Sequence, residues 1–358
     1  MKEFKENINL GNELSSEFER ALIPIFGAEI NQLFKDEAAR FLQQTIDNYL
    51  SHSYDDIEQE SVLLGVNGAP VLHRGDISVI QGQVKSGKSA FAAWLAGALL
   101  NPDGVGTVIE GAYTESVTTP RVLYFDTEQS QYYSMLHIRQ INEVAKTEPG
   151  MDAQGLYYIN AREYTTIEKI VLLEKAIREL RPDIVLLDGV ADLMQDTNSN
   201  PEASAICSAL MKLVKVYKCH ICSVIHQNHN SDKARGHIGS ELWRKSESVI
   251  QIKKEYAPDG SERFTADFPI TRGKQAEALI FARDEHGTPH RQYSKDLEAY
   301  KKALQKEFGD AQFTKFEATA ALMQVFPKLH KPSVEGILTK ICQLERVGQS
   351  HKVMYKIS

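Results

Sequence analysis

The segment GQVKSGKS at residues 82–89 constrains this 358-residue sequence more than any other. It matches the pattern G-x-x-x-x-G-K-[ST], in which a glycine-rich loop between a strand and a helix surrounds phosphate groups. An apolar stretch, Ile77–Ile80, precedes the loop, and an Ala- and Leu-rich stretch follows from Ser89. Gly82 and Gly87 allow the backbone to curl so that its N–H groups point inward. The segment therefore predicts a binding site for a nucleoside triphosphate.

The chemistry of such a loop assigns roles to its side chains. Lys88 is expected to reach the β- and γ-phosphates, and the Ser89 hydroxyl to bind Mg²⁺. The stretch Ile184–Asp188 is four apolar residues followed by an aspartate, which places a carboxylate at the carboxyl end of a buried strand. Asp188 is therefore the predicted second Mg²⁺ ligand. The residues expected to surround ATP are Gly82, Gln83, Val84, Lys85, Ser86, Gly87, Lys88 and Ser89.

Hydrolysis also needs a group that orients or deprotonates water. The predicted strand Val122–Asp126 runs into Asp-Thr-Glu at residues 126–128, so two carboxylates lie near its end. Glu128 is the preferred general base, and Asp126 is the alternative.

Strands and helices alternate along most of the chain, which predicts an α/β fold with a mainly parallel sheet covered on both faces. After residue 247 no helical pattern separates the strands, so these are expected to add antiparallel to one edge. The predicted strands are Ile77–Gln81, Val122–Asp126, Leu156–Asn160, Ile184–Asp188, His220–His226, Ser248–Lys253, Phe264–Ile270 and Ala278–Arg283, and the helices between them are Ser89–Leu100, Tyr132–Ala145, Thr166–Leu180 and Pro201–Tyr217.

Composition divides the chain into three parts. Residues 1–60 have apolar positions at helical spacing and are predicted to form a helical N-terminal segment. Residues 61–290 form the predicted ATPase core. Residues 291–358 carry three helical patterns, Leu297–Phe308, Lys315–Phe326 and Pro332–Leu344, followed by a hairpin pattern over Arg346–Ile357. Three helices and a hairpin are typical of a winged-helix domain.

These motifs in this order resemble RecA-fold ATPases, especially the branch of RadA- and KaiC-like proteins and hexameric replicative helicases. The lead-in GAPVLHRGDISVIQG (68–82) and the stretch SVIHQNHNSDKARGHIGS (223–240) carry the resemblance outside the phosphate loop. In character the chain is most similar to the compact RepA-type plasmid helicases. The resemblance implies a RecA-like P-loop core that uses ATP and Mg²⁺.

The resemblance also implies further site residues. Gln227 or its neighbour His226 would sense the γ-phosphate, and Lys233 with Arg235 would form a finger that reaches the ATP site of a neighbouring subunit. The active form would then be a homo-oligomer, most simply a ring. The loops 193–200 and 228–240 would contact single-stranded DNA, and their Asn, Ser, His, Lys and Arg side chains suit phosphate contacts.

Charge and hydropathy indicate which partners and which cellular compartment to expect. The net charge is −7, but residues 292–358 hold 11 Lys/Arg against 7 Asp/Glu. This basic segment is a candidate for contact with DNA or with a replication protein. The longest uncharged apolar run, Ala90–Leu100, is too short to cross a membrane, and the N-terminus has no signal-like apolar stretch, so a cytoplasmic protein is expected.

The leading hypothesis is an oligomeric, Mg²⁺-dependent ATPase that moves on single-stranded DNA, a helicase of a plasmid or mobile element that acts in DNA replication. Two alternatives remain. A RadA-type recombination or repair ATPase would assemble an open filament on DNA, and a KaiC-like regulatory switch would hydrolyse ATP without regard to DNA.

Overall fold

The computed structural model describes residues 60–109, 111–115, 120–228, 234–256, 262–291, 295–326, 334, 337–339, 341–347 and 352–357. The predicted N-terminal helical segment, residues 1–60, therefore lies outside the described residues except for Glu60. The chain divides into two compact units. The first ends at Leu279 and resumes over Arg283–His290, and the second holds Ile280–Ala282 and continues from Arg291.

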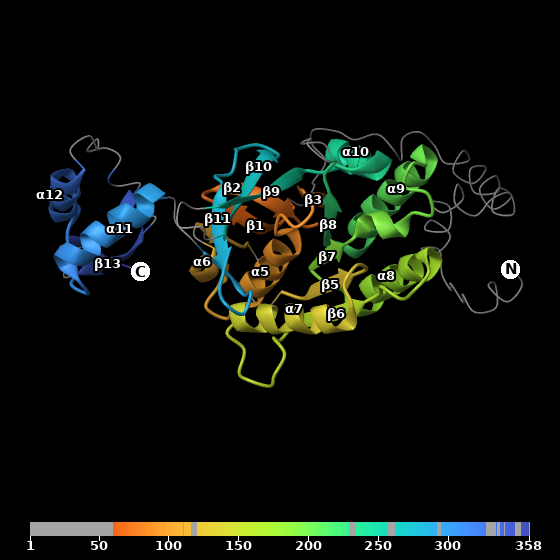
Figure 1. Ribbon diagram of the computed structural model, residues 1–358, viewed down its shortest axis with the longest axis horizontal. Coiled ribbons are helices and arrows are strands. Elements are labelled where there is room, and N and C mark those ends of the chain that lie inside the picture. The colour runs from red at the N-terminus through yellow and green to blue at the C-terminus, as the bar shows by residue number, and fades with distance from the viewer. Residues whose placement is uncertain are drawn as a thin grey trace, which may run out of the picture. The chain divides into compact units, whose positions relative to one another are not determined.

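Nine strands form one sheet, in the order β12-β11-β10-β9-β3-β8-β7-β5-β6 (Figure 1). The six strands from β9 to β6 in this order run parallel to one another. A mainly parallel sheet in an α/β fold is thus confirmed. The strands are β3 (Ile77–Gly82), β5 (Val122–Asp126), β6 (Leu156–Asn160), β7 (Ile184–Asp188), β8 (His220–His226), β9 (Ser248–Tyr256), β10 (Glu262–Ile270), β11 (Leu279–Arg283) and β12 (Pro289–Arg291).

The prediction that the strand beginning at Ser248 adds antiparallel was wrong. β9 runs parallel to β3, with Val79 opposite Val249, and only the next strand, β10, is antiparallel to β9. The reason is the helix α10 (Gly236–Lys245), which connects β8 to β9 and supplies the crossover that a parallel pair needs. This helix also occupies the second half of the stretch 228–240 that the sequence suggested as one loop.

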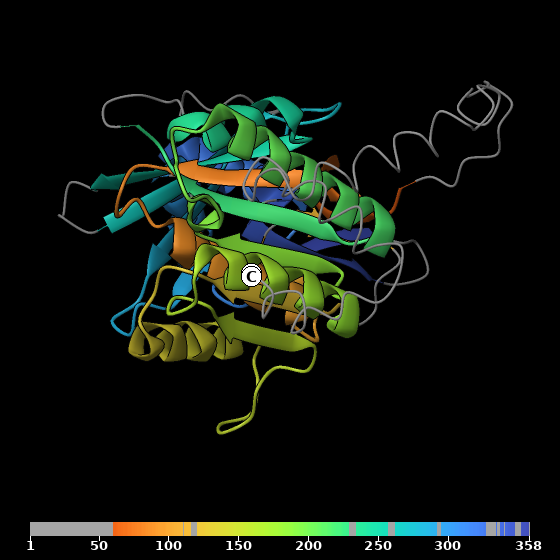
Figure 2. The ribbon, with the colours of Figure 1, turned by 90° about the vertical axis from the view of Figure 1, so that its right-hand side faces the viewer.

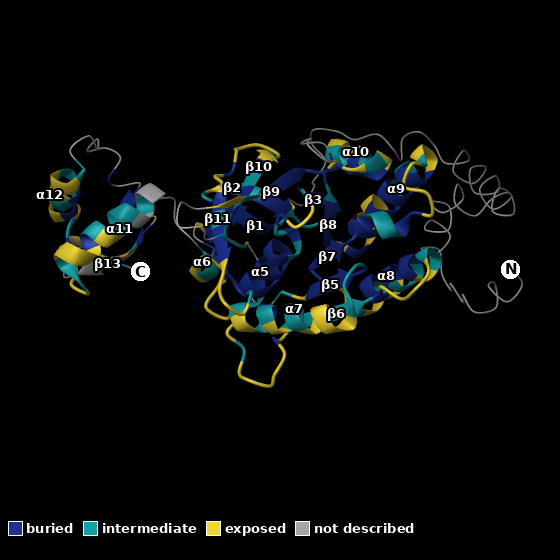
Figure 3. Ribbon diagram, viewed as in Figure 1, coloured by how far each residue is buried: buried dark blue, intermediate teal, exposed yellow. Residues whose placement is uncertain are grey.

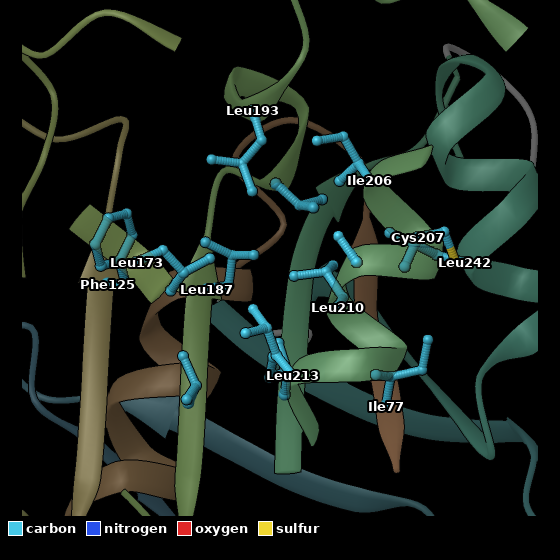
Figure 4. Packing of buried hydrophobic residues seen from close by; sticks show 14 of the residues in the cluster. Ile77, Phe125, Leu173, Leu187, Leu193, Ile206, Cys207, Leu210, Leu213 and Leu242 are labelled. Atoms are coloured by element: carbon cyan, nitrogen blue, oxygen red, sulfur yellow. The ribbon is translucent and has the colours of Figure 1, made fainter. Parts of the chain in front are cut away.

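Helices cover both faces of the sheet. One face packs against α8 (Thr166–Leu180), α9 (Asn200–Tyr217) and α10, and Figure 2 turns the molecule so that green helices of this face stand in front of the strands. Figure 4 shows this core, in which Leu187 and Ile77 of the strands meet Leu210 and Leu213 of α9. The burial colours of Figure 3 follow the same layers, with dark blue strands inside.

The opposite face is covered by α5 (Lys88–Leu100) and α7 (Gln131–Val144), which pack against each other. Side chains alternate along a strand. Because Leu123 and Phe125 of β5 point into the core with α8 and α9, Tyr124 and Asp126 point toward α5 and α7. The ring of Tyr124 indeed lies beside His137 of α7, with their centres 6.2 Å apart.

A second sheet has three strands, two of which come before the phosphate loop in the chain and one after it. Its order is β2-β1-β4, with β1 antiparallel to both neighbours. The sequence pattern did not predict these strands, which are β1 (Val62–Val66), β2 (Ala69–His73) and β4 (Ala112–Tyr113). Two short helical turns complete the unit, α6 (Val105–Val108) and η2 (Val190–Leu193).

The second unit contains α11 (Lys295–Phe308), α12 (Lys315–Val325) and the antiparallel pair β13 (Cys342–Val347) and β14 (Lys352–Ile357). Its core includes Leu304, Phe313, Leu322 and Tyr355. The predicted third helix, Pro332–Leu344, ends too late, because Cys342 already pairs with Ile357 in the hairpin. Within the described residues no helix is long and apolar enough to span a membrane.

Candidate nucleotide site

The phosphate loop leaves the carboxyl end of β3 and leads into α5. Gly87 precedes this helix with φ 93°, a left-handed conformation that favours glycine. A Cβ atom on Gly87 would lie 2.6 Å from the ring of Phe264 in β10, and one on Gly82 would lie 2.5 Å from the Ile252 carbonyl oxygen of β9. The strands β9 and β10 thus pack against the loop. Close packing requires a glycine at both positions, and the left-handed backbone is a second reason for glycine at Gly87 alone.

Lys88 lies at the centre of the site. Its ammonium donates to the carbonyl oxygens of Gly82 and Gln83, at 3.2 and 2.9 Å, and lies 3.0 Å from Nδ1 of His226. Burial lowers the pKa of Lys88, and the carboxylates of Asp188 and Glu128 oppose this shift. The lysine is therefore held among carbonyl groups, close to two carboxylates.

Asp188 lies at the end of β7, buried and 1% exposed. The Tyr124 hydroxyl donates to its Oδ2 atom at 2.8 Å, and the Ser89 hydroxyl also hydrogen-bonds to its carboxylate. Burial and the nearby Glu128 raise the pKa of Asp188 to about 6, although both hydrogen bonds act in the opposite direction. The structure thus brings the two predicted Mg²⁺ ligands, Ser89 and Asp188, into direct contact.

The two candidate bases differ in their surroundings. Asp126 is fully buried and accepts hydrogen bonds from the backbone N–H groups of Glu128 and Gln129 and from the hydroxyls of Ser134 and Tyr158. Its oxygens are therefore occupied in shaping the turn after β5. The carboxylate of Glu128 emerges from this turn toward the loop.

Glu128 and His226 face each other. Oε2 of Glu128 lies 3.6 Å from Nε2 of His226, whose other nitrogen contacts Lys88. The contact with His226, together with the charge of Lys88, lowers the pKa of Glu128 despite partial burial. The carboxylate stays ionised at neutral pH, as an acceptor for a water proton must be.

The two candidate sensors are also distinguishable. The ring of His226 bridges Lys88 and Glu128. Gln227 is 5% exposed, and its backbone N–H donates to the Gly82 carbonyl oxygen at 2.9 Å. The backbone of Gln227 thus ties β8 to the phosphate loop, and the side chain of His226 lies between Lys88 and Glu128.

Of the two predicted finger residues, the structure describes Arg235. Lys233 lies outside the described residues. Arg235 is exposed and precedes α10, and its backbone N–H donates to the His226 carbonyl oxygen at 2.8 Å. The start of α10 is therefore anchored to the strand that carries His226.

The loop can hold a phosphate group and a divalent cation. Ser86 is 4% exposed, and its Oγ atom has no hydrogen-bond partner within the described ranges of the chain, so it is a free donor beside Gly82. Ser89 and Asp188 offer the hard oxygen donors that Mg²⁺ prefers. These residues fit both a triphosphate and its Mg²⁺ ion.

Several residues that build the site were missed by sequence reasoning. Tyr124, Tyr158 and Ser134 hold the two aspartates, and Phe264 supports the loop. Tyr124 and Tyr158 occupy apolar strand patterns and carried no motif signal. Tyr124 lies two residues before Asp126, and Tyr158 lies two residues before Asn160. This alternation was the one sequence signal that the two tyrosines lie on the same face of the sheet as the aspartates.

A glycine-rich loop with its lysine and serine, opposite an aspartate at a strand end, defines a P-loop nucleotide-binding domain. Comparison with protein families agrees, because residues 56–232 match the family model described as an AAA domain. This match and the site geometry together indicate an ATPase-type domain. A comparison with curated proteins gave no match.

Proposed function

We propose that the protein is an oligomeric, Mg²⁺-dependent ATPase that moves on single-stranded DNA, and that it acts as a helicase of a plasmid or mobile element. The observation that carries the ATPase part is the convergence of Lys88, Glu128, Asp188 and His226 from four neighbouring strand ends onto one loop. The AAA-domain match over residues 56–232 supports the same activity.

Each side chain has a role that follows from its surroundings. Lys88 exchanges the Gly82 and Gln83 carbonyl oxygens for phosphate oxygens, because a phosphate offers full negative charge where a carbonyl offers only a dipole. That movement also separates Lys88 from His226 and leaves the imidazole free to turn toward the terminal phosphate. Ionised Glu128 orients the attacking water and accepts its proton. A Mg²⁺ ion held by Ser89 and Asp188 would neutralise charge on the phosphates.

The DNA part of the proposal rests on two loops that lie side by side. A Cβ atom on Gly236, at the start of α10, would lie 3.1 Å from the Thr197 carbonyl oxygen. Residues 195–198 are exposed, and they face the start of the helix that Arg235 precedes. This combined edge offers amide, hydroxyl and guanidinium groups, which suit contacts to the DNA backbone, together with the carboxylate of Asp196, which does not.

The oligomer part of the proposal rests on Arg235. This side chain is exposed, and a guanidinium from a neighbouring copy is an established way to offset charge in phosphoryl transfer. A head-to-tail arrangement in which each copy completes the next site closes into a ring. In an open arrangement the same contact would give a filament.

The test is steady-state ATPase activity with and without single-stranded DNA. Lys88→Ala is the blank, and Lys175→Ala, an exposed lysine of α8, is its matched control. ATP hydrolysis that persists in Lys88→Ala would refute the assignment of the nucleotide site. Stimulation by DNA followed by unwinding of a forked duplex would support the helicase.

A charge variant tests the proposed DNA edge. Asn198→Asp places a negative charge on the exposed loop and should reduce stimulation by DNA while leaving the DNA-free rate unchanged. Gln154→Glu adds the same charge before β6, at the opposite end of the sheet, and should have no effect. An equal loss of DNA stimulation in both variants would argue against DNA binding at this edge. A rate indifferent to DNA would favour a regulatory switch, and a filament without unwinding would favour a recombination ATPase.

A further inference from the structure

Two tyrosines, Tyr124 and Tyr158, contact the buried carboxylates at the nucleotide site. The parallel registers place Tyr124 opposite Tyr158 in β6 and opposite Leu186 in β7, with Asp126 opposite Asp188 two residues later. Because side chains two residues apart share a face, both tyrosines and both aspartates point to the side covered by α5 and α7. The tyrosine rings stack with their centres 4.9 Å apart and their planes at 5°.

Each tyrosine reaches the carboxylate of the neighbouring strand. The Tyr124 hydroxyl crosses from β5 to β7 and donates to Oδ2 of Asp188 at 2.8 Å. The Tyr158 hydroxyl crosses from β6 to β5 and donates to Oδ2 of Asp126 at 2.7 Å. A tyrosine hydroxyl thus donates a hydrogen bond to each of two carboxylates with different roles. Asp188 contacts Ser89, whereas Asp126 shapes the turn that carries Glu128.

We propose that Tyr124 is a positioning residue for the metal-side carboxylate: its hydroxyl fixes the orientation of Asp188, so that the aspartate is prepared for a divalent cation beside Ser89. This inference rests on the proposed ATPase function. Tyr124 is fully buried, and its ring is clamped between Tyr158 and His137, so the hydroxyl has little freedom to leave the carboxylate. Without that donor, Asp188 retains Ser89 alone among the hydrogen-bond donors described for it and can rotate away from the cation site.

The stacked neighbour provides a matched control. Tyr158→Phe removes the same atom from the same ring stack and also deprives a buried carboxylate of one donor. The general cost to folding is therefore similar in the two variants. Only Tyr124→Phe changes a group that touches a predicted metal ligand.

The experiment measures cation binding directly. Mn²⁺ replaces Mg²⁺, and its binding to the full-length protein with a non-hydrolysable ATP analogue is followed by electron paramagnetic resonance. Removing a partner that orients a metal ligand typically weakens metal binding about 10-fold or more. We expect that loss for Tyr124→Phe and a change below about twofold for Tyr158→Phe. Nucleotide binding without a divalent cation should be the same in wild type and both variants.

Other outcomes overturn the inference. Unchanged Mn²⁺ affinity in Tyr124→Phe, or equal losses in both variants, would mean that Tyr124 has no specific effect on the cation site. Should Tyr124→Phe fail to fold, 4-aminophenylalanine at position 124, which keeps a donor, is compared with 4-fluorophenylalanine, which lacks one. Equal affinity in that pair would again refute it. Failure of the proposed function is distinguishable, because wild-type protein would then bind no Mn²⁺ with the nucleotide analogue and hydrolyse no ATP.

Discussion

Replacing Gly189 by alanine should damage both stability and turnover. Gly189 follows Asp188 and has φ 99° and ψ 44°. A Cβ atom there would lie 2.1 Å from Oγ1 of Thr127 and 2.7 Å from Cγ of Glu128. No side chain fits this position unless Thr127 and Glu128 move, so the turn that carries the proposed base must shift.

The magnitude follows from three costs. A non-glycine residue in left-handed conformation loses about 1–2 kcal/mol. The displaced Thr127 hydroxyl hydrogen-bonds the carbonyl oxygens of Asp188 and Gly189, and weakening this arrangement costs about 0.5–1.5 kcal/mol. Overpacking in a rigid interior adds roughly 1–3 kcal/mol. Together these costs predict a loss of about 2.5–6.5 kcal/mol in the free energy of unfolding.

Gly150→Ala is the control, because Gly150 has φ 83° but a Cβ atom there would have no atom of the described residues within 4 Å. It carries the conformational cost alone, about 1–2 kcal/mol. Urea unfolding followed by the fluorescence of Trp94 and Trp243, both in the first unit, compares the two variants. A shift of about 1 Å in a catalytic group can reduce turnover about 100-fold, so Gly189→Ala should lose most ATPase activity whereas Gly150→Ala keeps it. Equal midpoints and equal rates in the two variants would refute the reasoning.

Three further predictions concern single side chains. Glu128→Gln should bind ATP with normal affinity but hydrolyse it at least about 100-fold more slowly, and a normal rate would transfer the role of base elsewhere. His73 donates to Glu247 over 2.6 Å, which raises the pKa of the imidazole. The resulting stabilisation is complete below the unfolded pKa of about 6.5 and is lost as pH rises through the folded value. Wild type should therefore exceed His73→Gln by about 1.5 kcal/mol at pH 5.5, and by less at pH 9, in urea unfolding. Arg235→Ala should abolish hydrolysis alone yet regain part of it when mixed with Lys88→Ala chains, and absence of rescue at every ratio would exclude a finger acting between copies.

The linear sequence was sufficient for the features that depend on local pattern. The loop GQVKSGKS, the strand ends at Asp126 and Asp188, and the helices α8 and α9 follow from short-range spacing, and the structure has them within one residue of the predicted bounds. Phosphate binding by backbone N–H groups needs only such local order. The placement of Lys88, Glu128, Asp188 and His226 at the carboxyl end of the sheet also followed, because parallel strands end on the same side.

Other features depended on contacts between distant segments. The direction of β9 was decided by α10, the short helix that provides the crossover between β8 and β9. The difference between Asp126 and Glu128 arises from four hydrogen bonds to Asp126. Two come from the backbone of its own turn, whereas those from Ser134 and Tyr158 form only once α7 and β6 pack beside β5. Likewise, His226 meets both Lys88 and Glu128 because β8 lies next to β3 and is separated from β5 by β7 alone. The sequence alone thus determined which chemical groups are present at the nucleotide site, whereas tertiary packing decided which of them are free to react, since a side chain's hydrogen bonds depend on neighbours that are remote in the chain.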